Sequence, residues 1–380
     1  MISPLPNELQ QLQEIVDRLF SQPELTDENG DPHFCRDLVR KMGEAGLLHH
    51  VTPDPSVRNL CFLRYAIAQK TALGDLLFAM QGLGSYPVSL AGNTEQKQKY
   101  LTAVAEGTLI CGFAITEPEA GSDAGSLRTR AEKTSGGYLL NGNKTLISNA
   151  GLADFYTLFA RTSEDSRAIT AFIVEASSAG LRTKPQELLA VHPIGQLEME
   201  SCFVPESRRL GNEGDGLKIA YATLDVFRSS VGAAATGMAE RAFQEAVHYA
   251  RKRRQFGKPL SEFQGIQFKI AEMAQLLQAS KLLIWDAATK KDSGAARIPL
   301  ESALAKSFAT ESAQQIIDQS LQIHGGIGLL KGSITERLYR DIRALRIYEG
   351  ATEVLKSIIA THYLKEDEPQ RHEGTKKNKK

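Results

Sequence analysis

The spacing of apolar residues changes twice along the chain, and this limits the folds that it can adopt. Up to about Gly107 apolar residues recur at steps of three and four, as in "LPNELQQLQEIVDRLF", which predicts helices. Between about residues 109 and 212, short β-rich runs such as "FYTLFART" replace this period, and the helical period then returns. We therefore predict a helical domain at 1–108, a β domain at 109–212, a helical bundle at 213–364 and a disordered tail at 365–380.

The β region contains one strong turn signal, in "YLLNGNKTLI". Asn141 and Gly142 favour the positive φ angles of a tight hairpin, so we predict a compact antiparallel unit with a turn there. In the last region, apolar residues from Phe263 onward recur at helical spacing, and a second long helix is predicted to end at Gly325 and Gly326.

The order of the elements and the charge balance exclude several classes of protein. No strand followed by GxGxxG and a helix is found, and no GxxxxGK, so neither a Rossmann dinucleotide site nor a P-loop is supported. The 45 basic and 45 acidic residues cancel, so we expect neither nucleic acid nor a membrane as a partner. No apolar run approaches the ~18 residues that cross a bilayer. Because the N-terminus also lacks a signal-peptide layout, we expect a cytoplasmic protein.

The cysteines and histidines give no metal-binding pattern. Cys35, Cys61, Cys111 and Cys202 are far apart in the chain and form no CxxC pair, so we predict buried thiols. The eight histidines show no HExxH spacing, and we expect no metal site.

Five stretches, taken together and in order, resemble the acyl-CoA dehydrogenase family, flavoenzymes that introduce an α,β double bond into acyl thioesters. They are "AITEPEAGSD", "NGNKTLISNAG", the long segment from "LDVFR" to "QFKIAEMA", "QIHGGIG" and "RLYRDIRALRIYEGATEV". The resemblance covers most of residues 5–364. It implies a mainly α fold with an N-terminal helical domain, a middle β-barrel and a C-terminal four-helix bundle, assembled as a homotetramer. FAD would lie between barrel and bundle, with its distal part crossing to a neighbouring subunit.

The resemblance also implies the residues that contact the flavin ring. Ile115 and Thr116 would bond to the ring, and the hydroxyl of Ser148 would reach flavin N5. Leu146 would cover the ring where the family usually has tryptophan, and Ile147 lies between these two contacts. Without the resemblance, a strand that ends in an ordinary polar turn would be the better interpretation of "AITEPEAGSD".

Further FAD contacts are implied in the C-terminal region. Arg253 would hold the pyrophosphate, because a guanidinium offers a bidentate fork to phosphate oxygens; the alternative is a solvated run of charges. Gln264 has a competing role, since Ser261 and Gln264 also match a capping box for the next helix. Glycines near the adenine would let the nucleotide approach the backbone, which is compatible with a helix C-cap. The remaining implied FAD contacts are Gln255, Gln322, Gly325, Gly326, Thr352 and Glu353.

A second set of residues would surround the acyl-CoA substrate. Ser122 would contact the CoA moiety, and Asp225 and Arg228 match positions around the substrate and its CoA. The alternative for this pair is a surface ion pair three residues apart on a helix, worth about 0.2–0.5 kcal/mol. Tyr348 and Gly350 complete the implied substrate contacts.

The stretch "RIYEGATEV" contains two glutamates that compete for the role of catalytic base. Glu353 has a structural explanation: if Gly350 caps the next helix, Glu353 is its third residue and faces free N–H groups. Glu349 precedes the helix and matches the family's base, which removes the α-proton while its backbone N–H bonds the thioester oxygen. Some branches place the base on the "LDVFR" helix, where this chain has Phe227. We therefore predict Glu349 as the base.

The resemblance therefore implies an FAD-dependent acyl-CoA dehydrogenase that transfers a hydride from the β-carbon to flavin N5. An electron-transferring flavoprotein is one candidate electron acceptor, and the sequence leaves the acceptor open. One alternative is an oxidase of the same fold that passes electrons to oxygen, and another is a non-catalytic interaction protein. An acyl carrier protein in place of CoA also remains open.

Overall fold

The first third of the chain is helical, as predicted. The computed structural model describes residues 6–26, 30–165 and 168–365. Buried Leu9, Leu12, Val16 and Leu19 form the inner stripe of the first helix. Local signals start others: Asp31 caps α2, and the side chain of Asn93 caps α5. The helices are α1 (Asn7–Leu19), α2 (Pro32–Glu44), α3 (Val57–Ala68), α4 (Ala72–Ala91) and α5 (Thr94–Ala105).

The middle region is a mixed sheet, with the strand order β6-β7-β3-β2-β4-β5-β8 and β1 beside β4. The predicted barrel is wrong in this respect: the sheet does not close on itself. The prediction of a purely antiparallel unit is also wrong, because β1 pairs with β4 in parallel. The strands are β1 (Cys111–Ala114), β2 (Arg130–Thr134), β3 (Gly137–Ser148), β4 (Phe155–Arg161), β5 (Ile169–Glu175), β6 (Leu181–Pro185), β7 (Ile194–Pro205) and β8 (Arg209–Leu210).

The predicted hairpin turn at Asn141 and Gly142 is wrong. Both residues lie inside β3, where the pairing with β7 shifts register between Leu140 and Gly142. Gly142 has φ 144°, and a Cβ there would lie 2.8 Å from the Cα of Thr129. The tight connection between β2 and β3 instead contains Gly136, with φ 79°. The glycine therefore serves a bulge and a close backbone contact rather than a turn.

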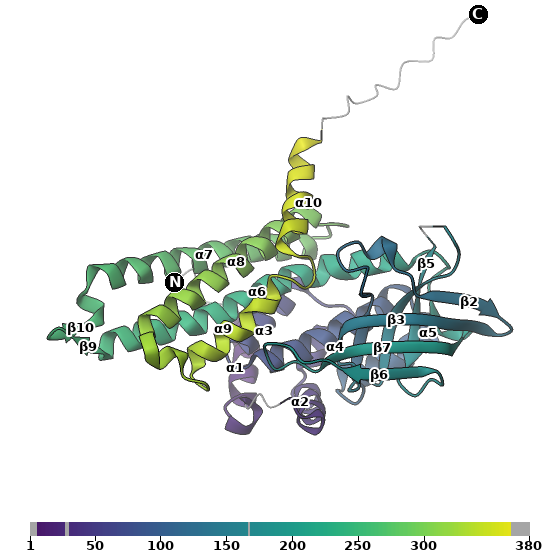
Figure 1. The fold of residues 1–380 in the computed structure, drawn as a ribbon, viewed down its shortest axis with the longest axis horizontal. Coiled ribbons are helices and arrows are strands. Elements are labelled where there is room, and N and C mark those ends of the chain that lie inside the picture. Colours follow the sequence, from purple (N-terminus) through teal and green to yellow (C-terminus); the bar gives the residue numbers. More distant parts are fainter. Residues whose placement is uncertain (1–5, 27–29, 166–167, 366–380) are drawn as a thin grey trace, which may run out of the picture.

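The C-terminal helices form a bundle around α6, which packs against α7, α8 and α9. Small residues on α6 allow close packing: a Cβ on Gly237 would lie 2.2 Å from the carbonyl oxygen of Tyr65 on α3. Figure 1 shows the sheet at one end of the molecule, the bundle at the other and α10 pointing away from the bundle. The helices are α6 (Gly216–Lys252), α7 (Gln264–Asp292), α8 (Pro299–His324), α9 (Ile334–Leu345) and α10 (Thr352–Leu364).

Helix α4 joins the two halves of the molecule. It contacts β1 and β4 on one side and α6 on another. Most of its side chains are buried, which explains why its sequence is apolar almost all round. The four cysteines are free and buried, as predicted. Among the described residues, no helix has both the length and the apolar content required to span a bilayer. The predicted disordered tail lies outside the described residues from residue 366 onward.

Two predicted helix starts are shifted. The capping box of Ser261 and Gln264 is absent: Phe263 is the N-cap, Gln264 is the first residue of α7, and the carbonyl of Ser261 accepts a hydrogen bond from Gln267 instead. Helix α10 starts after Ala351 rather than after Gly350, so Glu353 is its second residue. The C-cap of α8 at Gly325 is confirmed, with φ 62°.

Candidate active site

The predicted base, Glu349, lies in the short loop between α9 and α10. The loop is closed by the backbone N–H of Thr352, which donates to the carbonyl oxygen of Arg346 at 3.2 Å. Glu349 has φ 53° and Gly350 has φ 107°. Left-handed backbone is uncommon for a non-glycine residue and persists only where the surroundings hold it. The contacts that hold this loop are therefore part of the site.

Two buried cations hold the carbonyl oxygens of this loop. Arg228 on α6 donates through Nε to the carbonyl oxygen of Glu349 at 3.1 Å. Lys306 on α8 donates through Nζ to the carbonyl oxygen of Gly350 at 2.7 Å. Both side chains come from bundle helices and are buried. The bundle thus fixes two successive peptide units, Glu349–Gly350 and Gly350–Ala351, directly after the Glu349 Cα.

One carboxylate oxygen of Glu349 is left without a hydrogen-bond partner. Its Oε2 atom is buried and accepts no hydrogen bond in the described structure, although the residue as a whole is partly exposed. Burial raises the pKa of the Glu349 carboxyl, and the nearby cations Arg64, Arg228 and Lys306 oppose this shift without cancelling it. A buried carboxylate with a raised pKa and an unbonded oxygen is suited to accepting a proton.

Two other acidic groups near the loop, Asp75 and Asp225, are already paired. Asp75 accepts two hydrogen bonds from Arg64, at 2.9 and 2.7 Å, in a fully buried ion pair. Asp225 is buried and pairs with Arg297. Arg228 is also buried, so the interpretation of Asp225 and Arg228 as a surface ion pair is wrong.

The alternative positions for a base offer no comparable group. Glu353 is exposed, in the first turn of α10. Phe227 is fully buried, and its ring packs edge-on against Tyr86 with centroids 5.9 Å apart. A Cβ on Gly82 would lie 2.4 Å from the Phe227 ring. The Phe227 side chain is therefore part of the core that supports α6.

The predicted flavin contacts meet where β1 and β3 end. The backbone N–H of Thr145 donates to the carbonyl oxygen of Thr116 at 3.0 Å, which places the segment after β1 beside the end of β3. Leu146 has φ 55° and is half exposed, whereas the side chain of Ile147 lies in the core. Four predicted flavin contacts thus lie at one edge: Ile115, Thr116, Leu146 and Ser148. Because the side chain of Ile147 is in the core, only the backbone of Ile147 is available at this edge.

A buried ion pair that sequence reasoning missed supports this edge. Lys144 Nζ lies 2.8 Å from Glu117 Oε1 and also donates to the carbonyl oxygen of Ile115 at 3.2 Å. Glu117 also accepts the backbone N–H groups of Arg128 and Thr129. Glu117 and Lys144 both lie inside the motifs "AITEPEAGSD" and "NGNKTLISNAG", but the sequence does not show that they pair.

A cavity of about 510 Å³ at the far end of the bundle gathers four predicted FAD contacts. Arg253 and Gln255 line one part, and Gly325 and Gly326 line another. A Cβ on either glycine would meet nothing within 4 Å, so the backbone there is open to a ligand. A guanidinium beside open backbone fits the phosphates and ribose of a nucleotide. The other lining residues are Tyr249, Leu260, Ile323, His324, Ile327 and Leu330.

The other predicted contacts lie apart from this cavity. Gln264 and Gln322 are exposed and are not among its lining residues, and Ser122 is exposed on the loop after β1. Thr352 is buried at the start of α10, and its hydroxyl donates to Glu311 at 2.7 Å. Tyr348 is partly buried beside the Arg64–Asp75 pair, and burial raises its pKa.

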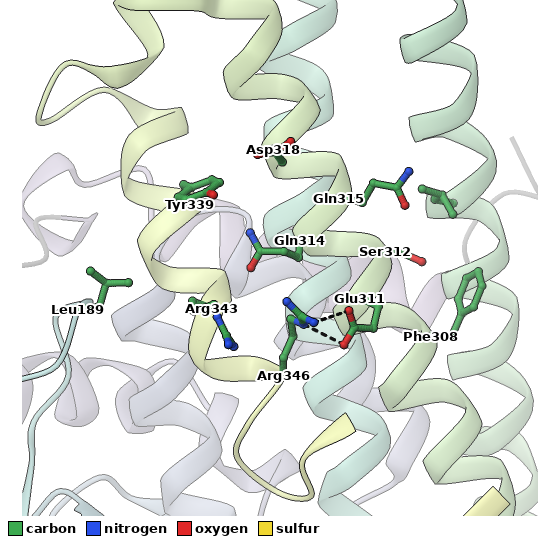
Figure 2. A pocket seen from close by; sticks show the side chains of 11 residues that line it. Leu189, Phe308, Glu311, Ser312, Gln314, Gln315, Asp318, Tyr339, Arg343 and Arg346 are labelled. Carbon is green, nitrogen blue, oxygen red and sulfur yellow. Dashed lines mark hydrogen bonds and ion pairs between the residues drawn. The ribbon is translucent and has the colours of Figure 1, made fainter. Parts of the chain in front are cut away.

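A larger cavity, of about 810 Å³, lies along α8 and α9 and contains none of the predicted site residues. Figure 2 shows Arg346 and Glu311 facing each other at its wall, joined by two contacts of 2.8 Å. Because Glu311 also binds Thr352, this wall anchors both ends of the Glu349 loop. It supports the loop rather than forming part of the proposed flavin site.

Comparison with known proteins decides the family. The model of the acyl-CoA dehydrogenase N-terminal domain matches residues 7–108, that of the middle domain matches 112–202, and that of the C-terminal domain matches 214–364. The chain belongs to the acyl-CoA dehydrogenase family. Members of this family use FAD, and this acyl-CoA dehydrogenase is accordingly an oxidoreductase that acts on CH–CH bonds.

Curated relatives extend along nearly the whole of this acyl-CoA dehydrogenase. It is 39% identical over 343 residues to an acyl-CoA dehydrogenase of Bacillus subtilis, covering 87% of this chain and 90% of the relative. It is 37% identical over 377 residues to the mitochondrial short-chain specific acyl-CoA dehydrogenase of Sus scrofa, covering 95% and 91%. Identity to the caffeyl-CoA reductase-Etf complex subunit CarC of Acetobacterium woodii is 36%, covering 92% and 96%.

Solved structures agree with this fold. Butyryl-CoA dehydrogenase from Megasphaera elsdenii superposes with a TM-score of 0.90 at 31% identity, covering 96% of this chain and 100% of that one. An acyl-CoA dehydrogenase from Bacillus anthracis complexed with FAD superposes with a TM-score of 0.88 at 29% identity, covering 95% and 67%.

Proposed function

We propose that Glu349 removes the α-proton of an acyl-CoA thioester in the desaturation that this acyl-CoA dehydrogenase catalyses. The observation that supports it is the buried, unbonded Oε2 atom of Glu349 in a loop whose backbone is held by Arg228 and Lys306. The α-proton would move to this carboxylate, and the backbone N–H of Glu349 would donate to the thioester oxygen as negative charge develops there. FAD, when bound, supplies the acceptor for the β-hydride.

The proposed FAD site has two parts. Ile115, Thr116, Leu146 and Ser148 would face the ring, and Arg253, Gln255, Gly325 and Gly326 would hold the distal nucleotide. Gln264, Gln322, Thr352, Glu353 and the backbone of Ile147 remain proposed contacts of FAD. Ser122, Asp225, Arg228, Tyr348 and Gly350 are proposed to surround the substrate.

Replacing the proposed base tests this function. Glu349→Gln keeps the shape of the side chain but removes its ability to accept a proton. We expect the purified variant to retain the visible spectrum of bound FAD and to lose flavin bleaching during anaerobic titration with short, medium and branched acyl-CoA thioesters. Glu245→Gln, which changes a partly exposed carboxylate on α6, is the matched control and should bleach normally. Full bleaching by Glu349→Gln would exclude Glu349 as the base.

We also propose an electron-transferring flavoprotein as the electron acceptor. One relative is named as a subunit of a complex that contains such a flavoprotein, and this supports the proposal. Leu146, which is half exposed, leaves the ring edge without aromatic cover. Turnover that depends on the flavoprotein is expected, whereas hydrogen peroxide formation at the full rate would favour an oxidase.

A homotetramer is our proposal for the assembly. Large apolar side chains are exposed on α7 and α10, and packing them against another chain would remove apolar surface from water. Light scattering at several concentrations would test this, and a monomer at every concentration would contradict it. These side chains are Phe268, Leu282, Trp285, Tyr363 and Leu364.

A further inference from the structure

The hydroxyl of Ser148 is hydrogen-bonded to an imidazole that the motifs did not indicate. Ser148 Oγ and His192 Nε2 are 2.8 Å apart. Ser148 ends β3 and pairs with Ile194 in the β3–β7 ladder, and His192 lies two residues before Ile194. The register of the sheet therefore brings the two side chains together.

One side-chain and one backbone hydrogen bond hold the segment that carries His192. At its start, the side-chain oxygen of Gln186 accepts the backbone N–H of Leu146 at 3.0 Å. At its end, the carbonyl oxygen of Pro193 accepts the backbone N–H of Asn149 at 2.7 Å. The residues on both sides of Ser148 are thus bonded to the segment that presents the imidazole, which restricts the position of the ring.

The pair is electrically neutral at physiological pH. Burial lowers the pKa of His192 to about 4, so the ring carries a single N–H. If that proton is on Nε2, the ring donates to Ser148 Oγ and the hydroxyl proton has to point elsewhere. Ser148 remains partly exposed, as does Leu146, whereas Ile147 between them is turned into the core. The open direction for the hydroxyl proton is therefore the edge that carries the proposed flavin contacts.

We propose that His192 is a positioning residue, which donates from Nε2 to Ser148 and so aims the Ser148 hydroxyl at the flavin ring. This inference rests on the proposed contact between Ser148 and flavin N5. A donor aimed at N5 favours oxidised flavin, in which N5 is an acceptor, over reduced flavin, in which N5 carries a proton. Loss of the hydrogen bond from the Ser148 hydroxyl to N5 should therefore raise the midpoint potential of bound FAD.

A double-mutant cycle tests the proposal in the holoenzyme. His192→Phe keeps an aromatic ring but removes the donor, and Ser148→Ala removes the hydroxyl. We expect His192→Phe to change the ratio of oxidised to reduced flavin about tenfold, which is ~30 mV for a two-electron couple. It should have no further effect in the Ser148→Ala background, because its action passes through that hydroxyl. Equal shifts in both backgrounds, or none in either, would overturn the proposal.

Two further variants separate positioning from a general structural effect. His192→Asn can donate through its amide and should restore the wild-type potential. His33→Phe, which changes an exposed histidine on α2, should leave the potential unchanged. If His192→Phe does not fold, His192→Leu, which also lacks a donor, replaces it in the cycle, and a shift that persists in the Ser148→Ala background overturns the proposal.

Nitrogen-15 NMR of the imidazole gives a readout that does not depend on FAD. The proposal requires the proton on Nε2, and a ring with Nε2 unprotonated would overturn it, because Ser148 would then donate to His192. Bleaching by acyl-CoA tests the proposed dehydrogenation separately. Normal bleaching with an unprotonated Nε2 would refute the role of His192 and leave the role of Glu349 intact.

Discussion

Lys306 Nζ donates a 2.7 Å hydrogen bond to the carbonyl oxygen of Gly350, the residue that follows the proposed base. The side chain of Lys306 is fully buried, and burial lowers its pKa to about 8. Lys306 on α8 thereby holds the backbone of the loop that contains Glu349, which lies 43 residues further along the chain. Packing of α8 against this loop is therefore coupled to the position of the carboxylate.

Lys306→Met should remove the hydrogen bond to the carbonyl oxygen of Gly350 while keeping a side chain of similar length. Hydrogen bonds to charged groups contribute about 1.5–3 kcal/mol, so we expect kcat/KM for acyl-CoA to fall about 10- to 100-fold. FAD content should stay near that of the wild type, because Lys306 does not line the proposed FAD cavity. Lys290→Met, at an exposed lysine on α7, is the control. Unchanged kcat/KM in a folded Lys306→Met protein would show that the loop holds its shape without this bond.

The pH dependence of kcat/KM should report the raised pKa of Glu349. Only the carboxylate accepts a proton, so the rate should fall as the pH is lowered through this pKa. The acid limb of the profile is expected above the ordinary glutamate value. Steady-state rates at limiting substrate, measured across the acid range, check this. An acid limb at or below the ordinary value would contradict the effect of burial.

The same shift predicts how Glu349→Gln affects stability. Because the pKa of Glu349 is raised in the folded protein, the stabilising contribution of the protonated form is complete below the unfolded pKa and is lost as pH rises through the folded pKa. Glutamine cannot ionise and escapes this loss. The thermal midpoint of Glu349→Gln minus that of the wild type should therefore be larger at pH 8 than at pH 5. Equal differences at the two pH values would refute this.

The buried Arg64–Asp75 pair should be sensitive to the loss of one partner. Asp75→Asn leaves the buried Arg64 charge without its bonded counter-charge, and we expect a loss of about 3–5 kcal/mol in the free energy of unfolding. The exposed pair Arg130–Glu164 provides the comparison: Glu164→Gln should cost less than about 1 kcal/mol. Urea denaturation of both variants measures the difference. Similar small losses would show that solvent reaches the Arg64 site.

Two neighbouring arginines test the distal part of the FAD site. Arg253 lines the cavity, whereas Arg254 does not and instead donates to the carbonyl oxygen of Gly257 at 2.8 Å. Arg253→Met should weaken FAD binding about 10- to 100-fold, because a charge-assisted bond to phosphate is lost. Arg254→Met should change it much less. Equal effects of the two changes, measured by reconstitution of the apoprotein, would argue against a specific phosphate contact.

Two local sequence patterns predicted the wrong local structure, and in each case a contact in the folded protein explains the difference. Asn141 and Gly142 have the composition of a turn, but pairing of β3 with β7 on one side and the close approach of Thr129 keep them inside a strand. Ser261 and Gln264 have the spacing of a capping box, yet the short turn before α7 places the cap at Phe263. In both places tertiary packing overrides a local preference.

By itself, the sequence determined the order of helices and strands and the family motifs, and it predicted Glu349 rather than Glu353 as the base. These depend on side-chain periodicity and on residues that are close in the chain. Only the tertiary structure decided that the sheet stays open, that Arg228 and Lys306 hold the Glu349 loop, and that His192 meets Ser148. The residues of each such contact lie more than 40 positions apart, and their meeting depends on helix packing and strand register, which no local pattern encodes.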